Sequence, residues 1–219
     1  RWVILAGGGE HEVMVANAVI GALTVLPLAG FLVALGASRS AQLWSGLVLA
    51  STPLHIRFSA SDGQFAVDGF LAMILLWSVA RFARDRQPRW MVLASLTTIL
   101  LCQIRLESVT TALAAALLTV ALGRRWPWRN PWPWAAALGT GLALVPHIAT
   151  SIVPMLGPNS SARPSSGAPD WPPNVAFYVF QNPEYVSPLI IGALVLGLAF
   201  GRLSWPVRLW LVAVMYGTA

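Results

Sequence analysis

The chain has 219 residues, of which 57% are hydrophobic and only 10% are charged. A soluble globular domain carries about 25% charged residues, so this chain cannot cover a water-facing surface with polar groups. All 14 basic residues are arginine, and the formal net charge is +6. Because these arginines fall in short turns between apolar runs, the charge indicates membrane topology rather than a nucleic-acid partner. The composition predicts a polytopic protein of the lipid bilayer.

Three further features of the sequence limit the kind of protein that it can be. The single cysteine, Cys102, excludes an intramolecular disulfide framework and a multi-cysteine metal site. Arginine without lysine is typical of GC-rich coding, which favours a bacterial protein of the inner (plasma) membrane. The sequence opens at Arg1 without a methionine and stops at Ala219 inside an apolar run, so we expect it to be a piece of a longer protein.

Eight apolar runs are long enough, or nearly so, to cross about 30 Å of hydrocarbon. They cover residues 13–36, 41–55, 64–83, 90–104, 109–123, 134–156 and 189–201, and the eighth begins near residue 209. We therefore expect an all-α transmembrane helix bundle, forming one domain over residues 1–219. A loop rich in proline and serine is expected at residues 157–188.

The turns between these runs differ sharply in charge. If the chain crosses regularly, ten arginines fall on one side, and seven of the eight acidic residues fall on or near the other. The ten are Arg39, Arg81, Arg84, Arg86, Arg89, Arg124, Arg125, Arg129, Arg202 and Arg208. Because cytoplasmic loops are enriched in basic residues, we expect this side to be cytoplasmic. The N-terminal end and residues 157–188 would then face outward.

The outward ends of the predicted helices hold most of the unusual polar residues, and Asp68 is the first of them. Ser61 and Gln64 have the spacing of a capping box, which predicts a helix that starts near Ser61. Asp68 would then lie almost two turns inside, about 10 Å along the axis. A carboxylate at that depth is costly unless it faces a cavity or a partner, so Asp68 is a candidate catalytic residue. A structural hydrogen bond between helices is the alternative.

Two outlying arginines are candidate phosphate ligands. Arg57 follows His55 in one outer turn, and Arg105 precedes Glu107 in the run CQIRLES. A planar guanidinium holds two phosphate oxygens at once, with Glu107 orienting Arg105. The alternatives are snorkelling of Arg57 to the interface and an Arg105–Glu107 ion pair that closes the turn. His147, in the run 134–156, either packs through a hydrogen bond or contacts an anionic headgroup.

Glu10, His11 and Glu12 follow three glycines at the outer mouth of the first run. Two carboxylates and an imidazole could hold a divalent cation. Three consecutive residues rarely aim at one ion, however. The favoured interpretation is a solvated helix start with acidic residues near its N-terminus.

The order of these features resembles a known family. The helix SGLVLASTPLHIRFS follows a basic turn, the helix FAVDGFLAMILLW starts with an aspartate, and RLES follows the next basic turn and helix. Over residues 10–125 the sequence looks like the middle of a polyprenyl-phosphate-dependent glycosyltransferase of the GT-C fold. Within that fold it is similar to the protein O-mannosyltransferase-like and aminoarabinose-transferase-like enzymes.

The resemblance implies an inverting membrane glycosyltransferase that moves a sugar from a polyprenyl-phosphate donor to an acceptor at the outer face. A carboxylate would deprotonate the acceptor, and arginines would stabilise the leaving lipid phosphate. Asp68 matches the second outward acidic position of the family, and Arg57 and Arg105 are its phosphate-binding candidates. The family's principal catalytic acid lies in an earlier outer loop, so within these residues Glu10 or Glu12 would have to replace it.

Two other function classes compete with this one. A non-catalytic scaffold subunit would pair the same polar residues with each other or with neighbouring membrane subunits. A transporter is less favoured, because the sequence has no inverted repeat and almost no polar residue near the midplane. The enzyme, in contrast, predicts an outward-opening cavity beside Asp68, Arg57 and Arg105.

Overall fold

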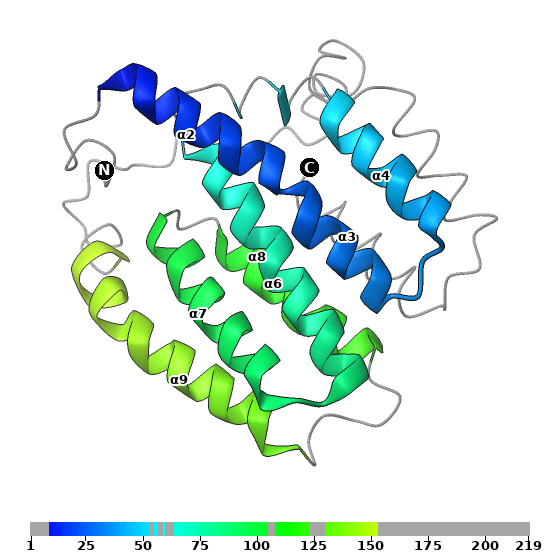
Figure 1. The fold of residues 1–219 in the computed structure, drawn as a ribbon. Coiled ribbons are helices and arrows are strands. Elements are labelled where there is room, and N and C mark those ends of the chain that lie inside the picture. The colour runs from blue at the N-terminus through cyan, green and yellow to red at the C-terminus, as the bar shows by residue number, and fades with distance from the viewer. Residues whose placement is uncertain are drawn as a thin grey trace, which may run out of the picture.

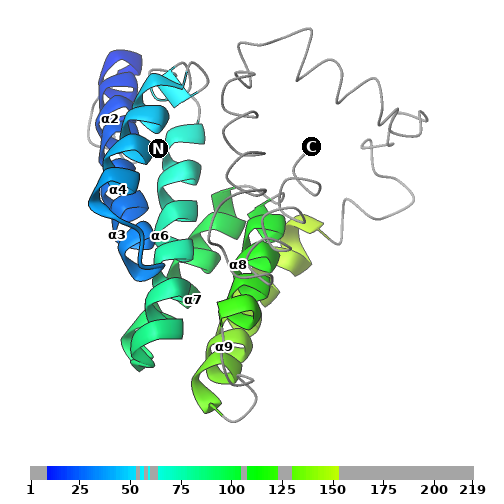
Figure 2. The same ribbon diagram turned by 90° about the vertical axis from the view of Figure 1, so that its right-hand side faces the viewer.

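The computed structural model describes residues 9–52, 55–56, 59, 64–104, 108–122 and 130–152. Within these ranges the chain is helical and has no strand (Figures 1 and 2). The helices are α2 (Glu10–Leu23), α3 (Val25–Ala34), α4 (Arg39–Ser51), α6 (Phe65–Asp85), α7 (Pro88–Ile104), α8 (Ser108–Leu122) and α9 (Pro131–His147), and a π-helical turn (Ile148–Ile152) follows. Within the described residues, the first six predicted runs are therefore mainly helical. The runs at 189–201 and from 209, and the loop at 157–188, lie outside the described residues.

The helices cross back and forth between two ends of the bundle (Figure 1). One end, here called the arginine end, carries Arg39, Arg81, Arg84, Arg86 and Arg89, where α3 and α6 finish and α4 and α7 begin. The other, the acid end, carries Glu10, Glu12 and Asp68, where α2 and α6 begin. Within the described residues, the arginines and most of the acidic residues therefore lie at opposite ends of the bundle, as the sequence predicts.

The first predicted run is two helices rather than one. The helices α2 and α3 meet at Thr24, which is a turn residue. Pro27 explains the break, because it has no N–H to donate and its ring crowds the carbonyl of the residue four positions earlier. The Thr24 hydroxyl donates to Ile20 O at 3.1 Å, so the buried side chain is satisfied inside the helix.

The helix α6 is the centre of the bundle and packs against α2, α3, α7 and α8. Its Leu75, Val79 and Phe82 are almost completely buried, and they join one hydrophobic core with residues of α3, α7 and α8. Close packing between α3 and α6 depends on Gly30. A Cβ atom placed there would lie 2.6 Å from Cε2 of Trp77, so only glycine lets the indole lie against the α3 backbone.

The exterior of the bundle is apolar, whereas several buried side chains are small or polar. Leu43 and Trp44 of α4 are 70% and 67% exposed, and Leu138 of α9 is 65% exposed. Ser78 and Thr97 are buried and donate to carbonyls of their own helices. Continuous apolar surface of this kind would aggregate in water and is the expected surface of a helix bundle in lipid.

Two helical stretches of the described chain are long and apolar enough to cross a membrane: Glu10–Ala34 and Phe65–Asp85. At 1.5 Å per residue, the 21 residues of α6 span about 30 Å, which matches the hydrocarbon thickness. Pro88–Ile104 is apolar but shorter. The structure therefore supports a helical membrane protein.

Candidate active site

Asp68 lies in the first turn of α6, which corrects its expected depth. The helix begins at Phe65 with Gln64 as its N-cap, and Asp68 N donates to Gln64 O at 2.9 Å. The predicted start near Ser61 is wrong, because Gln64 is the N-cap and its carbonyl oxygen accepts this first hydrogen bond of the helix. Three residues of rise put Asp68 about 5 Å into the helix. The Asp68 side chain is half-buried in this first turn.

Glu10 and Glu12 form the start of α2 in the way that the favoured interpretation predicts. Both are exposed, and Glu12 Oε2 accepts a hydrogen bond from Gly9 N at 2.8 Å. Glu12 therefore caps its own helix by satisfying a free backbone donor. Among the described residues, no group of three or more histidine, cysteine or acidic side chains is arranged to hold a metal ion.

The acidic residues share one end of the bundle but do not form one cluster. Gly21 of α2 lies directly against Ser59, which belongs to the connection that leads into α6. Glu10 lies eleven residues before Gly21, or about 16 Å farther along the α2 axis. The helix α2 accordingly extends beyond the start of α6 (Figure 1). Glu10 and Glu12 are therefore displaced outward from the level at which α6 begins.

The other candidate residues are described only in part. Arg57, Arg105 and Glu107 lie outside the described residues. His55 is half-buried. His147 is half-buried too and is the last residue of α9, at the acid end, immediately before the π-helical turn.

The arginine end has a dense network of local contacts. Arg81 Nη2 lies 2.9 Å from Asp85 Oδ2, and Arg84 Nη1 donates to Val33 O at 3.2 Å. Arg81 and Arg89 lie 5.2 and 5.3 Å from the ring centroid of Trp90. These contacts join the end of α3, the end of α6 and the start of α7. The arginines thus act here as structural groups as well as positive charges.

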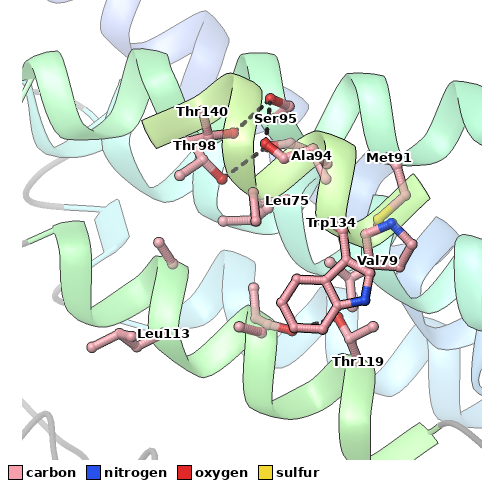
Figure 3. Close-up of a pocket in the computed structure, with 16 residues that line it drawn as sticks. Leu75, Val79, Met91, Ala94, Ser95, Thr98, Leu113, Thr119, Trp134 and Thr140 are labelled. Carbon is pink, nitrogen blue, oxygen red and sulfur yellow. Dashed lines mark hydrogen bonds between the residues drawn. The ribbon is translucent and has the colours of Figure 1, made fainter. Parts of the chain in front are cut away.

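Two cavities open in the described bundle, and Asp68 lines neither of them. An apolar cavity of about 410 Å³ lies between α6, α7, α8 and α9 (Figure 3). A second, of about 580 Å³, lies where α3, α6 and α8 end, and Arg84 and Arg86 line it. Sequence reasoning missed the apolar cavity, because its walls are ordinary alanine, leucine and threonine residues. An outward-opening cavity beside Asp68 remains a prediction.

Comparison with known proteins agrees with this architecture. A family model described as dolichyl-phosphate-mannose-protein mannosyltransferase matches residues 2–149, which is more than half of the chain. The matched range contains all of the helices from α2 to α9 and therefore Asp68, Glu10, Glu12 and His55. No curated protein and no solved structure matches the chain.

Proposed function

We propose that this chain, which belongs to the dolichyl-phosphate-mannose-protein mannosyltransferase family, transfers a sugar from a polyprenyl-phosphate donor to an acceptor at the acid end of the bundle. The observation that carries the proposal is the family match over residues 2–149. The family makes the chain a membrane glycosyltransferase with a lipid-linked sugar donor, and the apolar exterior of the helices agrees with a protein that meets its donor in the bilayer.

The acid end is the proposed reaction face, directed away from the cytoplasm of a bacterial inner membrane. Five described arginines lie at the opposite end, against one acidic residue, Asp85. Basic residues concentrate on the cytoplasmic side of membrane proteins. The positions of these charges therefore support an outward acid end, with the acceptor and the donor phosphate meeting near the start of α6.

Asp68 is the proposed proton acceptor. Its carboxylate would take the proton of the acceptor's nucleophilic group, which attacks the anomeric carbon with inversion as the bond from that carbon to the phosphate oxygen breaks. The lipid phosphate leaves with the electron pair of that bond. Glu12 is a weaker candidate, because its carboxylate already caps α2, and Glu10 is the remaining alternative.

Arg57 and Arg105 are the proposed ligands of the donor phosphate. A guanidinium can donate two parallel hydrogen bonds to phosphate oxygens and keeps its charge at every physiological pH. Both residues follow stretches that approach the acid end, since α4 and α7 finish there. His55, Glu107 and His147 are proposed as supporting contacts around the same phosphate.

Transfer by the full-length protein in proteoliposomes tests this function. We expect a labelled sugar to move from polyprenyl phosphate, and not from a nucleotide sugar, to a protein or lipid acceptor. Arg57→Ala and Arg105→Ala should raise the KM for the lipid donor, whereas Arg39→Ala, at the opposite end, should leave it unchanged. Transfer from a nucleotide sugar would contradict the proposed donor. Absence of any transfer, with the protein isolated in a stable complex, would favour the scaffold.

A further inference from the structure

The apolar cavity between α6, α7, α8 and α9 is distinct from the proposed reaction site. Leu75 and Val79 are its lining residues on α6, and they lie seven and eleven residues beyond Asp68. These separations correspond to about 10 and 16 Å along the helix. On α7 and α9 the cavity is lined by residues of the first three turns, such as Met91, Ser95 and Thr140. The cavity therefore extends from the middle of the bundle towards the arginine end.

The walls of the cavity are made of small residues on three facing helices. A larger apolar side chain at any of these positions would occupy the space. Protein interiors are normally packed as densely as organic crystals, so an open space of this size is unusual. At about 410 Å³, the cavity is between two and three times as large as an apolar cavity of about 150 Å³ that holds benzene. The alanines that leave this space are Ala94, Ala112, Ala115, Ala116, Ala136 and Ala137.

The hydroxyl groups in the walls are already satisfied. Ser95 Oγ and Thr140 Oγ1 are 2.6 Å apart, and Thr98 Oγ1 donates to Ala94 O at 2.8 Å (Figure 3). Thr119 Oγ1 donates to Ala115 O at 3.0 Å. An ordered water needs two to four polar partners, and a headgroup needs charged or donating groups. These walls favour hydrocarbon over either of them.

The cavity opens towards the exterior of the bundle. Leu113 of α8 and Trp134 of α9 line it and are 61% and 50% exposed. The surrounding surface is also apolar, because Leu117 and Leu138 are 54% and 65% exposed. A chain that enters here therefore comes from the hydrocarbon layer rather than from water.

We propose that this cavity is a binding site for one acyl chain of a phospholipid in the leaflet at the arginine end. The chain would fill the space between α7, α8 and α9, and the headgroup would lie near the start of α7. Arg89 is exposed there, and anionic headgroups are attracted to basic residues at a membrane surface. The bound lipid would take the place of side-chain packing that the alanines do not supply.

A photoreactive phospholipid tests this site directly. The full-length protein would be reconstituted in nanodiscs with phosphatidylglycerol that carries a diazirine within one acyl chain, and the crosslinked peptides would be mapped. We expect labelling to concentrate on Met91, Leu113 and Trp134 relative to exposed Leu96 and Leu43. Ala137→Phe, which fills the cavity, should abolish this excess. Ala135→Phe, on the same helix and outside the lining, should retain it.

Three results would overturn the proposal. Labelling spread evenly over all the exposed apolar faces would show that lipid contacts the bundle without a site. Equal labelling of the Ala137→Phe and Ala135→Phe proteins would show that the excess does not come from the cavity. Displacement of the probe by polyprenyl phosphate, but not by phosphatidylglycerol without the diazirine, would assign the cavity to the tail of the sugar carrier.

Discussion

The two ends of the bundle use their charged residues differently. At the arginine end, Arg81, Arg84, Arg86 and Arg89 have local structural partners: a carboxylate, a carbonyl oxygen or an aromatic ring. At the acid end, Glu10, Glu12 and Asp68 lie in the first turns of helices. Glu12 caps its own helix there, and Asp68 is the residue proposed to take part in sugar transfer.

Because of this difference, we expect substitutions at the two ends to affect different properties, stability at one end and catalytic turnover at the other. The contacts at the arginine end join α3, α6 and α7, so any effect of changes there should be on stability rather than on turnover. Asp68 belongs to the end where the proposed transfer takes place, so its loss should alter turnover while the bundle stays folded. Three substitutions test the structural half of this comparison, and a pair of aspartates tests both halves.

The largest expected effect on stability comes from Phe82→Ala. The Phe82 side chain is completely buried in the core beside the arginine end, and the Arg86 guanidinium lies 5.9 Å from its ring centroid. Removal of a buried phenylalanine typically costs about 3–5 kcal/mol of unfolding free energy. Denaturant unfolding in detergent would measure it, with Leu138→Ala on the exposed face of α9 as the control. Equal effects of the two substitutions would contradict the assigned core.

An intermediate effect is expected for Gly30→Ala. The added Cβ would lie 2.6 Å from Trp77, and a rigid indole in contact with α3 cannot yield without moving a helix. Overpacking of this kind costs about 1–3 kcal/mol. The matched control is Gly139→Ala on α9, where nothing lies within 4 Å of the new methyl group. There the better helix propensity of alanine should raise stability by up to about 1 kcal/mol. A stabilised Gly30→Ala protein would show that α3 and α6 are not in close contact.

The smallest effect is expected for Asp85→Asn. Asp85 pairs with Arg81 one helical turn away, and the two side chains are 21% and 28% exposed. Partly exposed pairs at this spacing contribute about 0.3–0.5 kcal/mol, and Trp90 continues to hold Arg81 after the change. The midpoint of thermal unfolding should therefore move very little. A loss as large as that of Gly30→Ala would mean that the ion pair fixes the turn between α6 and α7.

The helices could be predicted because their apolar runs are bounded by arginines. The run at 64–83 became Phe65–Asp85, and the run at 90–104 became Pro88–Ile104. The break at Thr24 could not be predicted from hydrophobicity, because Pro27 lies inside a continuous apolar run. The spacing of Ser61 and Gln64 predicts a start that is too early, because Gln64 is itself the N-cap and the helix begins at Phe65.

The candidate site was predictable in part. Residue type and position within the runs identified Asp68, and the charge asymmetry indicated which end it occupies. Spacing within one helix does not show which neighbouring helix a residue contacts. The outward displacement of Glu10 and Glu12 is therefore visible only in the structure, from the contact between Gly21 and Ser59. The apolar cavity was not predictable, because the alanines of α8 and α9 signal it only once those helices face each other.

The central claim is that the acid end carries out sugar transfer, and two aspartates of the same helix test it. Asp68 and Asp85 begin and end α6, so Asp68→Asn and Asp85→Asn remove one carboxylate from each end. The measurement is kcat for sugar transfer from polyprenyl phosphate by the full-length proteins in proteoliposomes. We predict a loss of about 10²-fold or more for Asp68→Asn, the scale of lost acid–base catalysis, and a nearly unchanged rate for Asp85→Asn. Equal rates in the two variants would contradict the account.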